Sequence, residues 1–120
     1  MVKKVFAFLM FFVPLLVAGC SLCHDQVVAD QNSPDGVLTA TEFLRDCGAT
    51  TGFSTIVSVH RIGSDFKDDG DIVFVVRGKG PLQLRWNQSR SLAIICTACQ
   101  RADIFREVRA LGDVNIAFGP

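Results

Sequence analysis

Apolar and polar residues alternate along most of the chain after residue 36, and this period of two is typical of half-buried β-strands. Residues 54–62 illustrate it, with His60 on one face of the expected strand and Val57 and Val59 on the other. The run IVFVV (72–76) is apolar throughout, which favours a strand in the middle of a sheet. The predicted strands are residues 37–44, 54–62, 72–76, 82–86, 91–96 and 114–118. Short strands separated by turn signals predict an all-β fold, a small antiparallel meander or sandwich.

Glycine- and proline-rich segments mark the turns between these strands. In the segment SPDG (33–36), Pro34 presets φ at the second position of a turn and Gly36 supplies a positive φ. Residues 103–111 are ambiguous because their apolar positions have near-helical spacing. We expect a hairpin through residues 110–113, and one or two helical turns remain the alternative.

The first twenty residues resemble the signal segment of a bacterial lipoprotein. Lys3 and Lys4 precede an apolar run that is too short to span a bilayer but fits an export signal. The following residues, VAGC (17–20), resemble a lipobox, which implies acylation of Cys20 and cleavage before it. Two or more acyl chains, such as palmitate, hold a protein at the bilayer. We therefore expect a signal peptide (1–19), a lipidated N-terminus and linker (20–34) and a β domain (35–120). Ser21 after the modified cysteine resembles outer-membrane lipoproteins facing the periplasm.

The same cysteine belongs to a second motif. Cys20, Cys23 and His24 form C-x-x-C-H, the attachment site of a c-type haem. Haem and lipid exclude each other because both need the sulfur of Cys20. Both methionines lie in the expected signal, so His60 is the one candidate for a second axial ligand. We favour the lipid and expect no cofactor.

Export would place the remaining cysteines in an oxidising compartment. Cys23, Cys47, Cys96 and Cys99 allow three pairings, and the sequence does not choose among them. Cys96 and Cys99 are close enough in sequence to pair with each other, which would leave Cys23 for Cys47. Pairing of Cys47 with Cys96 or Cys99 stays equally open.

Composition narrows the function classes. Removal of residues 1–19 from the 120 leaves 101, enough for one core. Ten basic and twelve acidic residues remain, so the net charge is about −2, and no clustered basic face indicates nucleic acid.

Several segments resemble a family of small exported bacterial proteins of unknown function. They are SPDG (33–36), DCGATTGFSTIVSV (46–59), DIVFVVRG (71–78) and LQLRWNQSRSLAI (82–94). More distantly, SPDG and LQLRWNQSRSLAI resemble the repeats of periplasmic β-propellers. With at most two such units, this resemblance implies a propeller-blade-like sheet or a small sandwich, not a closed propeller. Neither resemblance implies an activity.

Cys96 and Cys99 form the C-x-x-C of a possible thiol–disulfide site, but a reactive pair usually starts a helix, and here a strand precedes it. A structural disulfide is the favoured interpretation. Cysteines and histidines that would serve a zinc site are Cys23, His24, Cys47, His60, Cys96 and Cys99. Disulfide formation would consume these thiols, and we expect His60 to be a partly exposed sheet residue, so we expect no metal.

The acidic loop at 65–71 does not match the calcium-binding loop of an EF-hand. If that loop began at Asp65, Lys67 and Val76 would occupy its third and twelfth positions, where oxygen ligands are required. No nucleophile or phosphate-binding motif is present in the sequence.

One loop is a candidate binding site because its small residues permit close approach of a ligand to the backbone. Its candidate residues are Gly48, Thr50, Thr51, Gly52 and Phe53. Tight packing of this loop over the end of the sheet is the favoured alternative.

We expect a non-catalytic lipoprotein, bound to the lipid bilayer through Cys20, that serves a structural role or binds an envelope protein. Two other functions stay open. One is a thiol oxidoreductase acting through Cys96 and Cys99. The other is an inhibitor or immunity factor for an envelope-directed enzyme, using the loops at 63–71 or 47–53.

Overall fold

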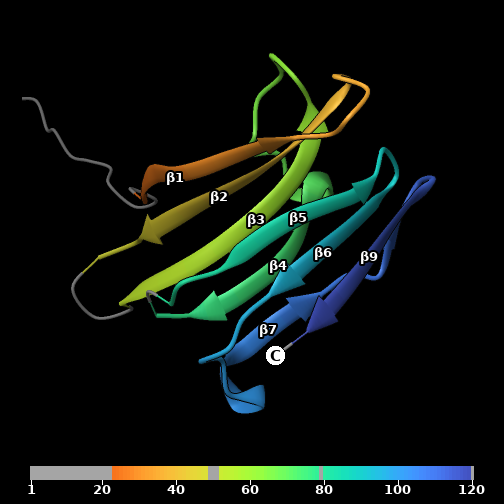
Figure 1. Cartoon of the computed structure of the whole chain (residues 1–120). Helices are drawn as coiled ribbons and strands as arrows, with labels where there is room; N and C mark the ends of the chain where they lie inside the picture. Colours follow the sequence, from red (N-terminus) through yellow and green to blue (C-terminus); the bar gives the residue numbers. More distant parts are fainter. Residues whose placement is uncertain (1–22, 49–51, 79, 120) are drawn as a thin grey trace, which may run out of the picture.

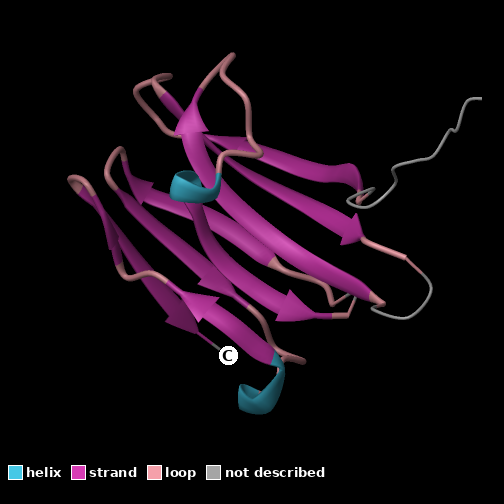
Figure 2. Ribbon diagram, turned by 180° about the vertical axis from the view of Figure 1, so that it is seen from behind, coloured by secondary structure: helices cyan, strands magenta, loops and turns pink. Residues whose placement is uncertain are grey.

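The chain folds into two β-sheets that lie face to face. The computed structural model describes residues 23–48, 52–78 and 80–119. One sheet has five strands in the order β1-β2-β3-β4-β7 and the other has four in the order β5-β6-β9-β8. Figures 1 and 2 show the two layers from opposite sides. The all-β sandwich predicted from the alternation is therefore confirmed.

The strand bounds follow the predicted ones closely between residues 38 and 95. The five-stranded sheet contains β1 (His24–Asn32), β2 (Leu38–Asp46), β3 (Phe53–Arg61), β4 (Ile72–Arg77) and β7 (Ile104–Glu107). The four-stranded sheet contains β5 (Gln83–Gln88), β6 (Ser91–Ile95), β8 (Ala110–Leu111) and β9 (Val114–Gly119). Two single-turn 3₁₀ helices, η1 (Asp69–Asp71) and η2 (Arg101–Asp103), precede β4 and β7. In the described part of the chain, no helix is long and apolar enough to cross a membrane.

The expected linker is wrong for residues 24–32, which form β1. This strand pairs antiparallel with β2, from His24 opposite Asp46 to Asn32 opposite Thr39, with a bulge between Val27 and Ala29. Its side chains are mostly exposed because β1 is at the edge of the sheet, so it lacks the apolar alternation that identifies a half-buried strand.

One strand pairing departs from an antiparallel meander. β9 pairs in parallel with β6, with Leu92 opposite Ile116. Parallel neighbours need a long crossover, and here the chain between β6 and β9 adds β7 to the five-stranded sheet and then forms β8. The ambiguous segment 103–111 therefore contains the last residue of η2, followed by strands β7 and β8. The hairpin expected through 110–113 is confirmed as β8 and β9, with Leu111 opposite Val114.

The facing sides of the two sheets form the main core. Its buried residues are Ala40, Val57, Val59, Val73, Phe74 and Val76 from the first sheet and Leu84, Leu92, Ile94, Val114 and Ile116 from the second. The rings of Phe74 and Phe118 lie 5.4 Å apart and join the layers directly. Val73, Phe74 and Val76 lie in this core, and Ile72 and Val75 lie in a second cluster on the outer side of the sheet, so residues 72–76 are apolar throughout.

A smaller apolar cluster covers the outer side of the first sheet. Phe43, Ile56 and Ile72 are buried there, and Phe66 from the loop between β3 and β4 packs edge-on against Phe43 with centroids 4.8 Å apart. The loop also covers His60, which is only 8% exposed, so the expectation of a partly exposed histidine is wrong. The sequence gives no signal that this polar loop folds back over the sheet.

Candidate functional site

The candidate site begins at the N-terminal disulfide. Cys23 immediately precedes β1 and is bonded to Cys47, which follows β2. His24, the histidine of the haem motif, is exposed at the start of β1. Because the sulfur of Cys23 is bonded to Cys47, it is not available for a thioether to a haem vinyl group. Cys20 lies outside the described residues.

The candidate binding loop follows this disulfide. Gly48 (φ 124°) and Gly52 (φ 73°) both adopt positive φ angles that side chains with a Cβ rarely adopt. The Gly48 amide donates to the carboxylate of Asp46 at 3.1 Å, and the Phe53 side chain is 38% exposed. Thr50 and Thr51 lie outside the described residues. The described part of the loop thus has glycine-dependent geometry and an exposed aromatic ring.

The second disulfide lines a cavity between the two sheets. Cys96 and Cys99 are bonded to each other, and the cavity beside them has a volume of about 320 Å³. Its apolar lining includes Phe74, Ile94, Ile104 and Phe118. Cys96 is 8% exposed and follows a strand, so it lacks the helix N-terminus that activates a thiol in redox pairs.

One carboxylate at this cavity pairs with two arginines. Glu107, whose side chain is 15% exposed, accepts from Arg101 at 3.2 Å and from Arg109 at 3.4 Å. The guanidinium of Arg109 also lies 5.3 Å from the centre of the Phe118 ring. An apolar cavity flanked by paired charges suits a binding surface better than acid–base catalysis.

Both disulfides lie at the same end of the sandwich, which we call the cystine end. Across the first sheet the register places Asp46 opposite both His24 and Phe53, with Arg77 and Ile104 near the same end. In the second sheet, β6 and β9 both end there, and the Cys96 amide donates to the Gly119 carbonyl at 3.0 Å. The two sequence motifs that contain cysteine are therefore brought to one end of the fold.

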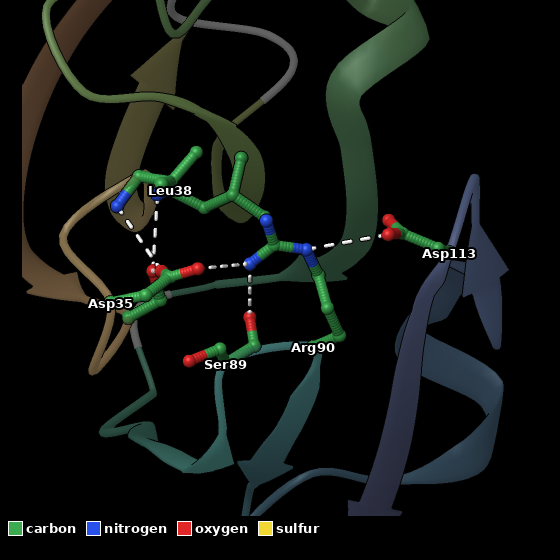
Figure 3. Close-up of polar contacts among 7 residues, drawn as sticks. Asp35, Leu38, Ser89, Arg90 and Asp113 are labelled. Carbon is green, nitrogen blue, oxygen red and sulfur yellow. Dashed lines mark hydrogen bonds and ion pairs between the residues drawn. The ribbon is translucent and has the colours of Figure 1, made fainter.

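Turns from both sheets meet at the opposite end, which we call the far end. Arg90, in the turn between β5 and β6, contacts Asp35 at 3.0 Å and Asp113 at 3.4 Å (Figure 3). The predicted SPDG turn is confirmed by a hydrogen bond from the Gly36 amide to the Ser33 carbonyl. Hydrogen bonds, chiefly from the Ser33 hydroxyl and also from Arg90, lower the pKa of Asp35 below its usual value.

The acidic loop at 62–71 starts at the far end, where β3 ends, and folds back over the outer side of the first sheet. Asp65 accepts from the Lys67 amide and Asp68 from the Gly70 amide, each at 3.0 Å, and Asp69 pairs with Arg106 of β7 at 3.4 Å. Burial, and next the neighbouring Asp68, raise the pKa of Asp71. Among the described residues, no group of three or more histidine, cysteine and carboxylate side chains is arranged to hold a metal ion.

A polar cluster on the outer side of the first sheet was missed by sequence reasoning. The Thr41 hydroxyl donates to Asp30 at 2.6 Å. His60 Nε2 lies 2.7 Å from the hydroxyl oxygen of Thr41. His60 Nδ1 faces the Arg61 carbonyl at 3.0 Å and the Ser64 hydroxyl at 3.2 Å. Polar residues at alternate strand positions indicate such a face, but only the register between strands shows that Thr41 and His60 meet.

The hydrogen bond and the burial of Thr41 argue against the simplest catalytic role, that of a hydroxyl nucleophile activated by His60. A nucleophilic hydroxyl gives its proton to the imidazole, whereas the Thr41 hydroxyl donates to Asp30 at 2.6 Å. Thr41 is also only 1% exposed. The cluster therefore ties β1, β2 and β3 together.

A scan against protein-family models, a search of curated proteins and a search of solved structures each find no match to this chain. The resemblance to small exported bacterial proteins stays a prediction. The features of this chain that bear on function are its cysteines, the geometry of the two ends and the sequence of the first twenty residues.

Proposed function

We propose that this protein is a lipoprotein of the bacterial cell envelope, anchored through acylated Cys20 and carrying a non-catalytic β-sandwich that binds an envelope protein. The proposed orientation has the domain facing the periplasm, from the outer membrane.

The observation that carries the proposal is the use of the five cysteines. Four of them form the two disulfides, which are typical of exported proteins. The fifth is Cys20, at the end of the lipobox-like sequence, so the two disulfides leave its sulfur for a lipid. The same pairing argues against a haem, since Cys23 would have to supply the second thioether.

The arrangement of polar groups favours binding over chemistry. The Thr41 hydroxyl beside His60 is buried and donates to Asp30, and the arginines at the cavity are paired with Glu107. The exposed surface, in contrast, includes the acidic loop at the far end. An inhibitor or immunity factor is one form of this function, and its contact surface would be that loop.

Intact mass spectrometry of the membrane-extracted protein, reduced and non-reduced, tests the proposal. We expect a chain that begins at Cys20, carries acyl chains and gains the mass of four hydrogens on reduction. A Cys20→Ser variant should lose the acyl chains and the membrane association. An unmodified Cys20 or a covalent porphyrin would contradict the proposal.

A second candidate is a thiol–disulfide protein, favoured by the position of Cys96–Cys99 on a cavity wall. Substrate dithiol would be oxidised to a disulfide as this cystine accepts two electrons and two protons. Equilibration with glutathione buffers followed by thiol alkylation separates the two functions. A structural pair stays oxidised across the buffers that reduce catalytic disulfides, whereas a redox-active pair is reduced in them.

A further inference from the structure

We infer that the cystine end of the sandwich lies against the phospholipid surface, with Phe53 and Phe105 in the interface and the far end directed away from the membrane. This inference rests on the proposed acylation of Cys20 and adds the orientation of the domain and the surface that contacts lipid.

The first argument is the short distance between anchor and fold. Only Ser21 and Leu22 separate Cys20 from Cys23, which is bonded to Cys47 at the cystine end. Three residues span at most about 11 Å when fully extended. Because β1 begins at His24, no long linker is present to hold the domain away from the lipid headgroups.

The second argument is the chemistry of the cystine end. Phe53 is 38% exposed beside the first disulfide, and Phe105 is 57% exposed next to the start of β7. The Arg77 guanidinium lies 5.1 Å from the centre of the Phe105 ring. Exposed aromatic rings with neighbouring arginines suit the boundary between headgroups and acyl chains.

The third argument is the difference in charge between the two ends. The far end and the loop at 62–71 that starts there carry six carboxylates, Asp35, Asp65, Asp68, Asp69, Asp71 and Asp113, against the four cations Arg61, Lys67, Arg90 and Arg106, the last of which is paired with Asp69. At the cystine end, Arg77 is paired with Asp103 and Arg101 with Glu107. An anionic membrane surface repels the far end more strongly. Since β2 and β3 each have nine residues, or about 30 Å, the far end is held well clear of the headgroups.

Quenching of tryptophan by brominated lipid tests this orientation. The acylated full-length protein is reconstituted into phosphatidylcholine–phosphatidylglycerol vesicles with or without bromine on the acyl chains. Single tryptophans are introduced by Phe53→Trp, Phe105→Trp and, as the matched control at the far end, Ile62→Trp, each in a Trp86→Phe background. Ile62 is 45% exposed, comparable to the two phenylalanines.

We expect the emission of the Phe53→Trp and Phe105→Trp proteins to fall in brominated vesicles and that of the Ile62→Trp protein to stay unchanged. The native Trp86, in the unsubstituted protein, should also be unaffected, which provides a control without any substitution. Equal quenching at both ends would mean that the domain lies on its side and would overturn the inference.

The same samples separate this inference from the proposed function. If mass spectrometry finds acyl chains but no tryptophan is quenched, the anchor stands and the orientation is wrong. If acyl chains are absent, the anchor is wrong and the orientation fails with it.

Discussion

Folding shifts the pKa values of two carboxylates on the first sheet, Asp25 and Glu42, in opposite directions. Asp25 is held by Arg45, whose Nε lies 2.8 Å from one carboxylate oxygen and whose Nη2 lies 3.0 Å from the other. These hydrogen bonds lower the pKa of Asp25. Glu42 is 6% exposed between Ala29 and Val57, and burial alone raises the pKa of its carboxyl. Asp25 thus stabilises the fold as an anion, whereas Glu42 is costly as an anion.

Replacing Glu42 with glutamine is expected to stabilise the protein at neutral pH. The variant keeps the shape of the side chain and removes a buried charge, so the free energy of unfolding should rise by up to about 1 kcal/mol. As the pH falls through the raised pKa toward the usual value of 4.5, the native carboxyl becomes protonated and the difference from the variant shrinks. Urea unfolding between pH 4 and neutral pH measures both effects.

The Asp25→Asn variant is the matched control of opposite sign. It should lower the free energy of unfolding by about 1 to 2 kcal/mol at neutral pH, because a hydrogen-bonded ion pair is lost. This loss should diminish as the pH falls from 3.8 through the lowered pKa of Asp25, where the native pair also disappears. If both variants changed stability in the same direction at neutral pH, the assignment of the two carboxylates would be wrong.

At the scale of elements, each disulfide constrains a different kind of segment. Cys23–Cys47 joins the ends of the edge strand β1 and its neighbour β2 across 24 positions of sequence. Cys96–Cys99 closes a short turn between β6 and η2. Strand β1 also depends on the Asp25–Arg45 pair and on a hydrogen bond from the Trp86 indole to the Gln31 carbonyl at 2.8 Å. An edge strand with few buried side chains therefore depends on cross-links.

Removing the two disulfides separately should have unequal effects. By loop-closure entropy, the Cys23→Ala/Cys47→Ala variant is expected to lose about 3.5 kcal/mol of stability and the Cys96→Ala/Cys99→Ala variant about 2 kcal/mol. Denaturant unfolding gives these values. Amide hydrogen exchange should show lost protection in residues 24–32 for the first variant only. Equal loss of protection there in both variants would contradict a local role for Cys23–Cys47.

These elements also show what the sequence can predict. Strands β2, β3, β5 and β6 follow from alternation and β4 from its continuous apolar run, and the glycines and Pro34 mark their turns. β1 could not be recognised from the sequence because it has no apolar face. It is held by its pairing with residues of β2, which the sequence does not reveal. The observed disulfides, Cys23–Cys47 and Cys96–Cys99, are one of the three pairings that the sequence allows. Which pairing forms depends on which strand ends meet in the fold. The Thr41–His60 contact likewise requires the register of β2 against β3.

At the scale of the whole molecule, Arg90 connects the turns of both sheets at the far end. It joins the turn between β1 and β2, through Asp35, to the turn between β8 and β9, through Asp113. The disulfides lie at the other end, where Cys23–Cys47 joins two strands of the first sheet and Cys96–Cys99 closes a turn in the segment that leads from β6 to β7. The side-chain ion pairs of Arg90 therefore link the two layers where no disulfide does.

An Arg90→Ala variant should lower the melting temperature by a few degrees, more than Arg101→Ala, which removes an exposed pair at the cystine end. The difference should decrease in high salt because both aspartates are partly or largely exposed. Thermal unfolding in low and high salt checks this. Identical melting temperatures for the two variants would show that Arg90 does not hold the layers together.

The parallel pairing of β6 with β9 has a consequence for the order of folding. Strands β1 to β4 pair with their sequence neighbours. This part of the first sheet can therefore form before the later residues of the chain are available to pair. The second sheet cannot do so, because β9 is an inner strand and the last one along the described chain. Until it inserts, β6 presents an unpaired edge that can bind another chain. Closure of the sandwich is therefore a late event, and a chain that stalled before residue 114 would be prone to associate with others.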